Sequence, residues 1–126
     1  IPNENLEGET PGSVGSGFVY DEDGHIITNH HVIDGAKKVA VRNGIGKVTE
    51  ATVAAISKDY DLAILELSNP YPKSYSIDAK DFVTPKAGDD VISIGYPGIG
   101  ITYEQPTITQ GIISKVFDDD DSRSCL

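Results

Sequence analysis

The sequence lacks the features that mark several common classes of protein. Its 126 residues include one cysteine, no tryptophan and no methionine, so no internal disulfide can form and a disulfide-rich secreted scaffold is excluded. No hydrophobic run approaches the roughly 18 residues that a membrane-spanning helix needs. The first residues also lack the basic and apolar regions of a signal peptide. We therefore expect no membrane span, and one domain or a domain with the beginning of another.

Basic residues are also scarce. Ten Lys and Arg stand against twenty Asp and Glu, which gives a formal net charge of −10. Such a surface repels phosphate backbones, so nucleic acid is excluded as an expected partner. His25, His30 and His31 have no cysteine at ligand spacing, so we predict no metal site. Nothing in the sequence indicates a cofactor.

What the sequence does contain is a series of short β-rich runs separated by turn residues. The acidic turn at 21–24 ends in Asp-Gly, which is a strong hairpin signal, so the first two runs should form an antiparallel pair. Helical periodicity is nearly absent, apart from a single turn expected at 31–36 and ended by Gly35. Six short strands favour an all-β barrel or sandwich. The six runs are 14–20, 24–29, 37–42, 47–56, 62–67 and 91–96.

The chain divides into three parts on this interpretation. Residues 1–13 are polar and without periodicity, so we expect a mobile N-terminal arm. Residues 14–98 hold the six strands, and within them the proline-containing stretch 69–88 is expected to be a long surface connection. Residues 99–126 contain one more β-rich stretch, at 106–117, with no strand partner after it. We expect the natural protein to continue past Leu126, because a strand paired along one edge is incomplete.

Four segments, in order along the chain, resemble the N-terminal half of HtrA/Deg-type trypsin-like serine proteases. The resemblance covers nearly the whole chain from Val14 onward, and each segment alone would be weak evidence. It implies a six-stranded antiparallel barrel, the first of a trypsin-like double-barrel fold, followed by the linker and first strand of a second barrel. The segments are Gly-Ser-Gly-Phe at 15–18 with Thr-Asn-His-His-Val at 28–32, Asp-Leu-Ala-Ile-Leu at 61–65, Gly-Tyr-Pro-Gly at 95–98 and Thr-Gln-Gly-Ile-Ile-Ser at 109–114.

The resemblance assigns two members of a Ser-His-Asp triad. His31 is expected to be the general base and Asp61 the carboxylate that orients it, in the chain order of chymotrypsin-like enzymes. His30 is expected to be structural or solvent-facing, and Asp59 a turn residue. Without the resemblance, His31 would more often be an ordinary surface histidine, and Asp61 would as often as not be an ordinary strand start. A folded barrel must bring the two side chains together across 30 positions of sequence.

The Gly-Asn-Ser-Gly-Gly motif that carries the nucleophile in this family is absent. Ser16 lies between two glycines, but its segment matches the opening strand of the family rather than the nucleophile loop. The chain is therefore expected to supply His and Asp to a serine endopeptidase and to be inactive by itself, with the serine located beyond Leu126. The family implies unfolded or extended polypeptides as substrates, a second barrel as partner and an extracytoplasmic location.

Two alternatives remain open at this point. The first is a catalytically dead relative that acts as a chaperone or peptide-binding module. The second is an unrelated small β-barrel binding protein, which predicts that His31 and Asp61 lie far apart. An isolated first barrel should also expose an apolar surface that favours self-association, so homo-oligomers are left open.

Overall fold

The computed structural model describes residues 13–96, 106–118 and 124–125. Strands dominate these residues, and helix is limited to one α-helical turn and two 3-10 turns. In chain order the elements are β1 (Gly17–Val19), β2 (His25–Thr28), α1 (His30–Ile33), β3 (Lys38–Arg42), β4 (Val48–Ser57), β5 (Leu62–Leu67), η1 (Lys73–Tyr75), η2 (Ala79–Asp81), β6 (Asp90–Gly95), β7 (Thr107–Ile112), β8 (Phe117–Asp118) and β9 (Ser124–Cys125).

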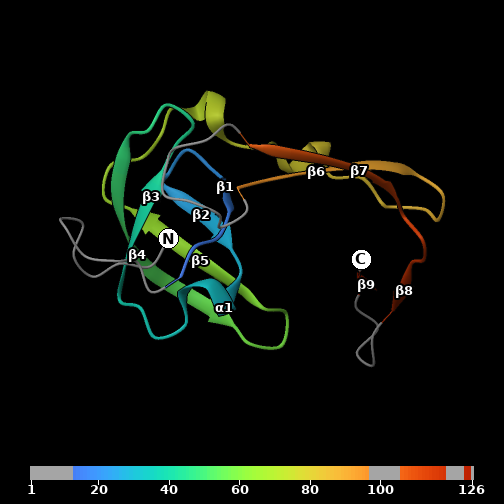
Figure 1. The fold of residues 1–126 in the computed structure, drawn as a ribbon, viewed down its shortest axis with the longest axis horizontal. Coiled ribbons are helices and arrows are strands. Elements are labelled where there is room, and N and C mark those ends of the chain that lie inside the picture. The colour runs from blue at the N-terminus through green and yellow to red at the C-terminus, as the bar shows by residue number, and fades with distance from the viewer. Residues whose placement is uncertain (1–12, 97–105, 119–123, 126) are drawn as a thin grey trace.

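The first five strands form one curled antiparallel sheet in the order β1-β2-β5-β4-β3 (Figure 1). The predicted β1–β2 hairpin is confirmed, and the side chain of Asp21 builds its turn. One carboxylate oxygen of Asp21 accepts hydrogen bonds from the backbone N–H groups of Asp23 (2.9 Å) and His25 (3.1 Å). Gly24 follows at φ 96°, a conformation that glycine adopts without a steric penalty. The acidic turn is therefore a local structural device.

The core lies on one face of this sheet, and the alternation of β5 shows why. Ala63, Leu65 and Leu67 are buried, whereas Leu62, Ile64 and Glu66 between them are exposed. Successive side chains of a strand point to opposite faces, so every second residue of β5 reaches the core. The buried hydrophobic residues that form the core are Ile26, Val32, Ile33, Val39, Ala51, Ala63, Leu65 and Leu67.

The all-β class and the likeness to a trypsin-like half-barrel are confirmed, but the six expected strands do not share one sheet. β6 pairs with β7 over six residues in a separate antiparallel hairpin, which projects to one side of the first sheet (Figure 1). The long connection after β5 stays in contact with the first sheet, since the Ile77 N–H donates to the Val19 carbonyl oxygen at 3.1 Å. Ser16 joins the two parts. Its hydroxyl accepts a hydrogen bond from the Tyr96 N–H at 2.6 Å and is 3.2 Å from the Tyr96 carbonyl oxygen.

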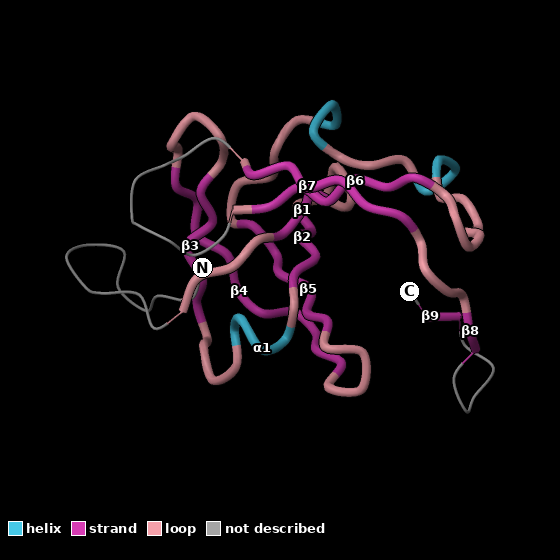
Figure 2. Tube along the Cα trace, turned by 45° about the vertical axis from the view of Figure 1, so that its right-hand side comes forward, coloured by secondary structure: helices cyan, strands magenta, loops and turns pink. Residues whose placement is uncertain are grey.

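The connection between β5 and β6 contains no strand, as expected for residues 69–88. It holds η1 and η2, which lie at the opposite end of the molecule from α1 (Figure 2). The β-rich stretch at 106–117 becomes β7 and the start of β8, and β8 pairs with β9. Of the predicted N-terminal arm, only Ser13 belongs to the described residues, and its hydroxyl donates to the Val32 carbonyl oxygen. The acidic run at 118–121 lies almost entirely outside them.

No helix in the described part of the chain has the length and apolar character needed to cross a bilayer.

Candidate functional site

The site begins where β2 ends and the chain turns into α1. Thr28 fixes this corner to the neighbouring segment, since its hydroxyl donates to the Ser16 carbonyl oxygen at 2.7 Å. Asn29 is still extended, with φ −86° and ψ 144°, and precedes the helical turn as its N-cap. Val32 and Ile33 then bury their side chains in the core. The two buried residues anchor the turn, and His31 directly before them is exposed to solvent.

The second strand of the site is β5, which is entered through a tight turn at residues 58–61. Asp61 has φ 55°, so it adopts the left-handed conformation that Asp and Asn tolerate better than most residues. Its N–H donates to the Lys58 carbonyl oxygen at 3.3 Å. Because β5 pairs with β2 in antiparallel register, with Thr28 opposite Ala63, the start of β5 meets the end of β2. The sheet therefore brings Asp61 to the histidines across the intervening sequence.

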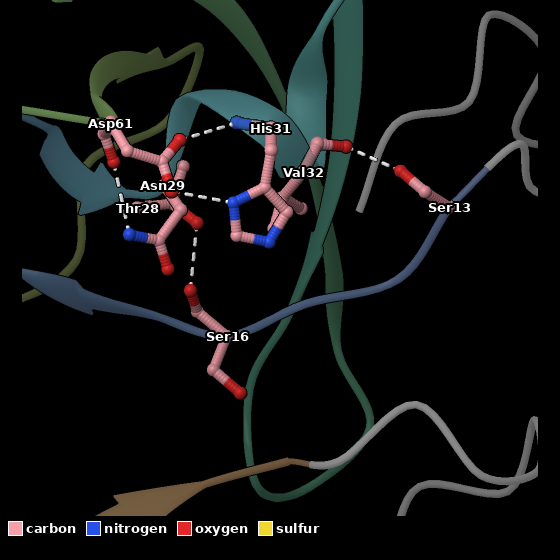
Figure 3. Close-up of polar contacts among 7 residues, drawn as sticks. All are labelled: Ser13, Ser16, Thr28, Asn29, His31, Val32 and Asp61. Atoms are coloured by element: carbon pink, nitrogen blue, oxygen red, sulfur yellow. Dashed lines mark hydrogen bonds and ion pairs between the residues drawn. The ribbon is translucent and has the colours of Figure 1, made fainter. Parts of the chain in front are cut away.

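His31 and Asp61 are joined by two hydrogen bonds (Figure 3). The His31 Nδ1 atom is 2.6 Å from one carboxylate oxygen of Asp61, and the His31 backbone N–H donates to the other at 2.8 Å. The carboxylate thus fixes both the backbone and the ring of the histidine. This contact is incompatible with the interpretation that placed the two residues far apart.

The pair is accessible to solvent. The His31 side chain is 70% exposed and the Asp61 side chain 43% exposed. The hydrogen bond from the His31 ring, with help from the His31 backbone N–H, lowers the pKa of Asp61 below its ordinary value of 3.8. Asp61 is therefore ionised at neutral pH. An ionised Asp61 accepts at Nδ1–H, and this leaves the Nε2 lone pair of His31 to take a proton.

A shallow hollow of about 200 Å³ adjoins this corner. Its walls come from β1, β2, the start of β5 and β6, and they are mostly apolar. The hydroxyl of Ser16, which lines the hollow, is bonded to Tyr96 rather than directed at His31 (Figure 3). Ser16 is therefore not the partner hydroxyl of this histidine. The lining residues are Ser16, Gly17, Phe18, Ile27, Thr28, Asn29, Leu62 and Ile94.

The other two histidines have different surroundings. His30 is structural, as expected, because its side chain is 13% exposed and its Nε2 lies 3.6 Å from Asp34. His30 is the first residue of α1. His25 has its Nδ1 2.6 Å from Asp21 and its Nε2 3.8 Å from Glu66. No group of three His, Cys, Asp or Glu side chains suited to a metal ion occurs in the part of the chain that the structure describes.

Asn29 is a contributor that we did not predict. Its side-chain amide donates to the backbone carbonyl oxygen of Asp61 at 3.0 Å. The sequence signal was present, because Asn29 lies two residues before His31 within the quoted Thr-Asn-His-His-Val segment. Its partner is a main-chain atom, however, and main-chain geometry is not visible in a sequence pattern.

Comparison with known proteins identifies the family of this chain. Residues 15–125 match the model of the trypsin-like peptidase domain. The chain belongs to the trypsin-like peptidase domain family. It is 40% identical over 103 residues to the serine endoprotease DegS of Salmonella typhimurium, and 37% identical over 106 residues to the chloroplastic Protease Do-like 1 of Arabidopsis thaliana. These matches cover 81% and 84% of this chain, but only 27% and 23% of the two relatives.

The fold of this trypsin-like domain has a solved counterpart. The crystal structure of a serine endoprotease from Yersinia pestis superposes with a TM-score of 0.71 at 31% identity, covering 96% of this chain and 40% of that one. The expected likeness to the HtrA/Deg type is therefore confirmed, and an unrelated barrel is excluded. The chain spans about a quarter of the length of the curated relatives named above.

Proposed function

We propose that this chain supplies the general base, His31, and its orienting carboxylate, Asp61, to a serine endopeptidase. The observation that carries the proposal is the 2.6 Å contact between His31 Nδ1 and the Asp61 carboxylate, with His31 largely exposed to solvent. A serine hydroxyl is a weak nucleophile at neutral pH, so it requires such a base. The nucleophile is proposed to lie in sequence that follows Leu126, since no serine of this sequence lies in a Gly-x-Ser-Gly turn.

The proposed reaction uses the two nitrogens of the ring for different tasks. As the serine oxygen bonds to the substrate carbonyl carbon, its proton passes to Nε2 of His31. The same proton then moves from Nε2 to the leaving amine as the C–N bond breaks, and a water molecule repeats the sequence to release the acyl group. Asp61 keeps Nδ1 protonated and stabilises the imidazolium without accepting a proton itself. The ionised state favoured by its lowered pKa suits this role.

The proposed substrates are unfolded or extended polypeptides, and the proposed partner within the whole protein is a second barrel. The exposed apolar side chains on β1, β5 and β6 support such a partner, because monomers rarely leave large apolar patches uncovered. They include Phe18 (46%), Leu62 (43%) and Ile94 (59%). We also propose a location outside the cytoplasm or in an organelle, since one relative named above is described as chloroplastic and a DegP-like relative from Brucella suis as periplasmic.

The decisive experiment uses the complete protein that carries this chain. Wild type should degrade casein, and His31→Ala should lose at least about a thousandfold in rate, the scale seen when a triad member is removed. His25→Ala is the matched control, because His25 also lies 2.6 Å from a carboxylate but at the opposite end of β2. Full activity in His31→Ala would refute the proposal.

The remaining alternative is a catalytically dead relative that binds polypeptides. It is favoured by one observation, namely that the Gly-Asn-Ser-Gly-Gly motif of the nucleophile is absent from this sequence. A fluorophosphonate probe separates the two functions, because it labels only an activated serine. Stoichiometric labelling of the complete protein supports the peptidase, whereas binding of unfolded casein without labelling or cleavage supports the binding module.

A further inference from the structure

Four hydrogen bonds connect the corner at residues 29–31 to the single residue Asp61. Two reach its carboxylate, from the ring and the backbone of His31, at 2.6 Å and 2.8 Å. Two reach its backbone carbonyl oxygen, from the Asn29 amide at 3.0 Å and the His30 N–H at 3.1 Å. The carbonyl oxygen of Asp61 therefore accepts as many hydrogen bonds from this corner as its carboxylate does.

The main chain needs this support, because the φ of 55° at Asp61 is the one positive value for a non-glycine residue in the described part of the chain. Left-handed backbone is unfavourable for an L-residue other than glycine, and it persists where surrounding contacts fix it. The backbone conformation also sets the direction of the Cα–Cβ bond. Relaxation of Asp61 to a right-handed or extended conformation would turn its carboxylate away from His31.

Asn29 is the N-cap residue of α1, but the carboxylate of Asp61 makes the hydrogen bond that an N-cap side chain normally makes. Asn is a preferred N-cap residue because its side-chain oxygen normally accepts from a backbone N–H of the first turn. Asn29 makes no such cap bond, and the N–H of His31 is taken by Asp61 instead. The Asn29 side chain is thereby released to donate its amide proton to the Asp61 carbonyl oxygen (Figure 3).

We infer that Asn29 is a positioning residue for the His31–Asp61 pair, and that it acts by holding the left-handed backbone of Asp61 through the bond from its amide to the Asp61 carbonyl oxygen. Asn29 touches no reacting atom in this scheme. Its effect on turnover rests on the proposed function, whereas its effect on the geometry of the pair does not.

Two substitutions separate this role from ordinary capping. Asn29→Asp keeps the size of the side chain and is an equally good N-cap, but it places an acceptor against the Asp61 carbonyl oxygen. Asn29→Ala removes the donor without adding charge. Asn43→Asp is the matched control for Asn29→Asp, because it makes the same change of shape and charge at another position. The Asn43 oxygen accepts from Ile45 N–H at 3.1 Å and from Lys47 N–H at 3.0 Å, and a carboxylate preserves both bonds.

The first measurement needs no catalysis. In the 126-residue chain, proton NMR should detect the hydrogen-bonded Nδ1–H of His31 as a low-field signal in wild type and Asn43→Asp. The signal should broaden into exchange with water in Asn29→Asp and Asn29→Ala. Urea unfolding of each variant shows that it remains folded under the conditions of the spectrum. A wild-type signal in Asn29→Asp would show that the residue is an N-cap only, and this would overturn the inference.

The second measurement uses the complete protein and a peptide substrate. Misplacement of a catalytic group by about 1 Å can cost a hundredfold in rate, so kcat should fall between about tenfold and a hundredfold in both Asn29 variants. KM should stay within about twofold of wild type, because substrate contacts are unchanged. An unchanged kcat in both variants overturns the inference. If instead His31→Ala retains full activity, the proposed function fails, and the NMR result still decides whether Asn29 positions Asp61.

Discussion

The tight packing between β1 and β2 gives a prediction whose size follows from the structure. A Cβ atom built on Gly17 would lie 2.7 Å from the backbone carbonyl oxygen of Ile27, 3.1 Å from Ile26 Cγ2 and 3.3 Å from Thr28 Cβ. The closest atom belongs to the main chain of the paired strand, where Phe18 opposes Ile27, so it cannot rotate away. Gly17→Ala must therefore shift β1 against β2. Overpacking of this kind destabilises by about 1–3 kcal/mol.

Gly111 provides the matched control, because a Cβ there meets no heavy atom within 4 Å. Gly111→Ala should be neutral or stabilising by up to about 1 kcal/mol, since alanine restricts the unfolded chain more than glycine does. Urea unfolding followed by circular dichroism measures both variants, and the midpoint should fall for Gly17→Ala alone with an unchanged slope. Equal midpoints for Gly17→Ala and wild type would refute the argument that β1 and β2 leave no room for a side chain.

Three further predictions concern the core, the ionisable pair on the β1–β2 turn and the open face. Leu65→Ala should lower the free energy of unfolding by about 2–5 kcal/mol, measured in urea, because Leu65 is 2% exposed and a cavity would replace it. Asp21→Asn should destabilise more at about pH 5.5 than at about pH 8.5. The hydrogen bond that the His25 ring donates to Asp21 raises the pKa of His25 above 6.5, and its contribution to stability is lost as pH rises through the folded value. Equal losses of stability at the two pH values would contradict this prediction. The chain should self-associate in light scattering through its exposed apolar side chains, and Ile94→Lys should reduce the apparent mass, since Ile94 is 59% exposed.

The contribution of Asp21 to stability has the opposite pH dependence from that of His25. Partial burial opposes ionisation of Asp21, but its hydrogen bonds with the His25 ring and with the backbone of His25 and Asp23 outweigh that effect and lower its pKa below 3.8. A carboxylate with a lowered pKa stabilises the fold above its ordinary value, and the contribution is lost as pH falls through the folded value. The pair should therefore contribute most between about pH 4 and pH 6.5, when both groups are charged.

The sequence was most informative where structure is local. The Asp-Gly turn at 21–24 predicted the first hairpin, and the β-rich run at 62–67 predicted the strand β5, because each pattern depends on neighbouring residues only. The partner of β6 was not predictable in this way. β6 pairs with β7 in a separate two-stranded sheet, and the composition of a strand carries no information on which strand it pairs with.

The residues of the candidate site also differ in how far the sequence could predict them. His31 and Asp61 could be named because the residue types that their chemistry needs lie in recognisable segments, and β2–β5 pairing brings those segments together. The contribution of Asn29 could not be named, since it depends on the left-handed φ of a residue 32 positions away. A composition or motif does not specify a backbone angle at a distant turn. Such main-chain support becomes visible only in the folded chain.

A histidine close to a carboxylate is not sufficient to identify a catalytic base, and this chain contains the comparison that shows it. His25 and His31 both have Nδ1 at 2.6 Å from an aspartate oxygen. His25 is paired with a residue four positions away in the same hairpin, and its other ring nitrogen faces Glu66 at 3.8 Å. A second carboxylate favours a proton on Nε2, so that nitrogen is poorly suited to accept one from a hydroxyl. His31 has its aspartate supplied from another strand and is 70% exposed. The short contact at Nδ1 together with the exposed surroundings of Nε2 therefore directs the catalytic proposal to His31.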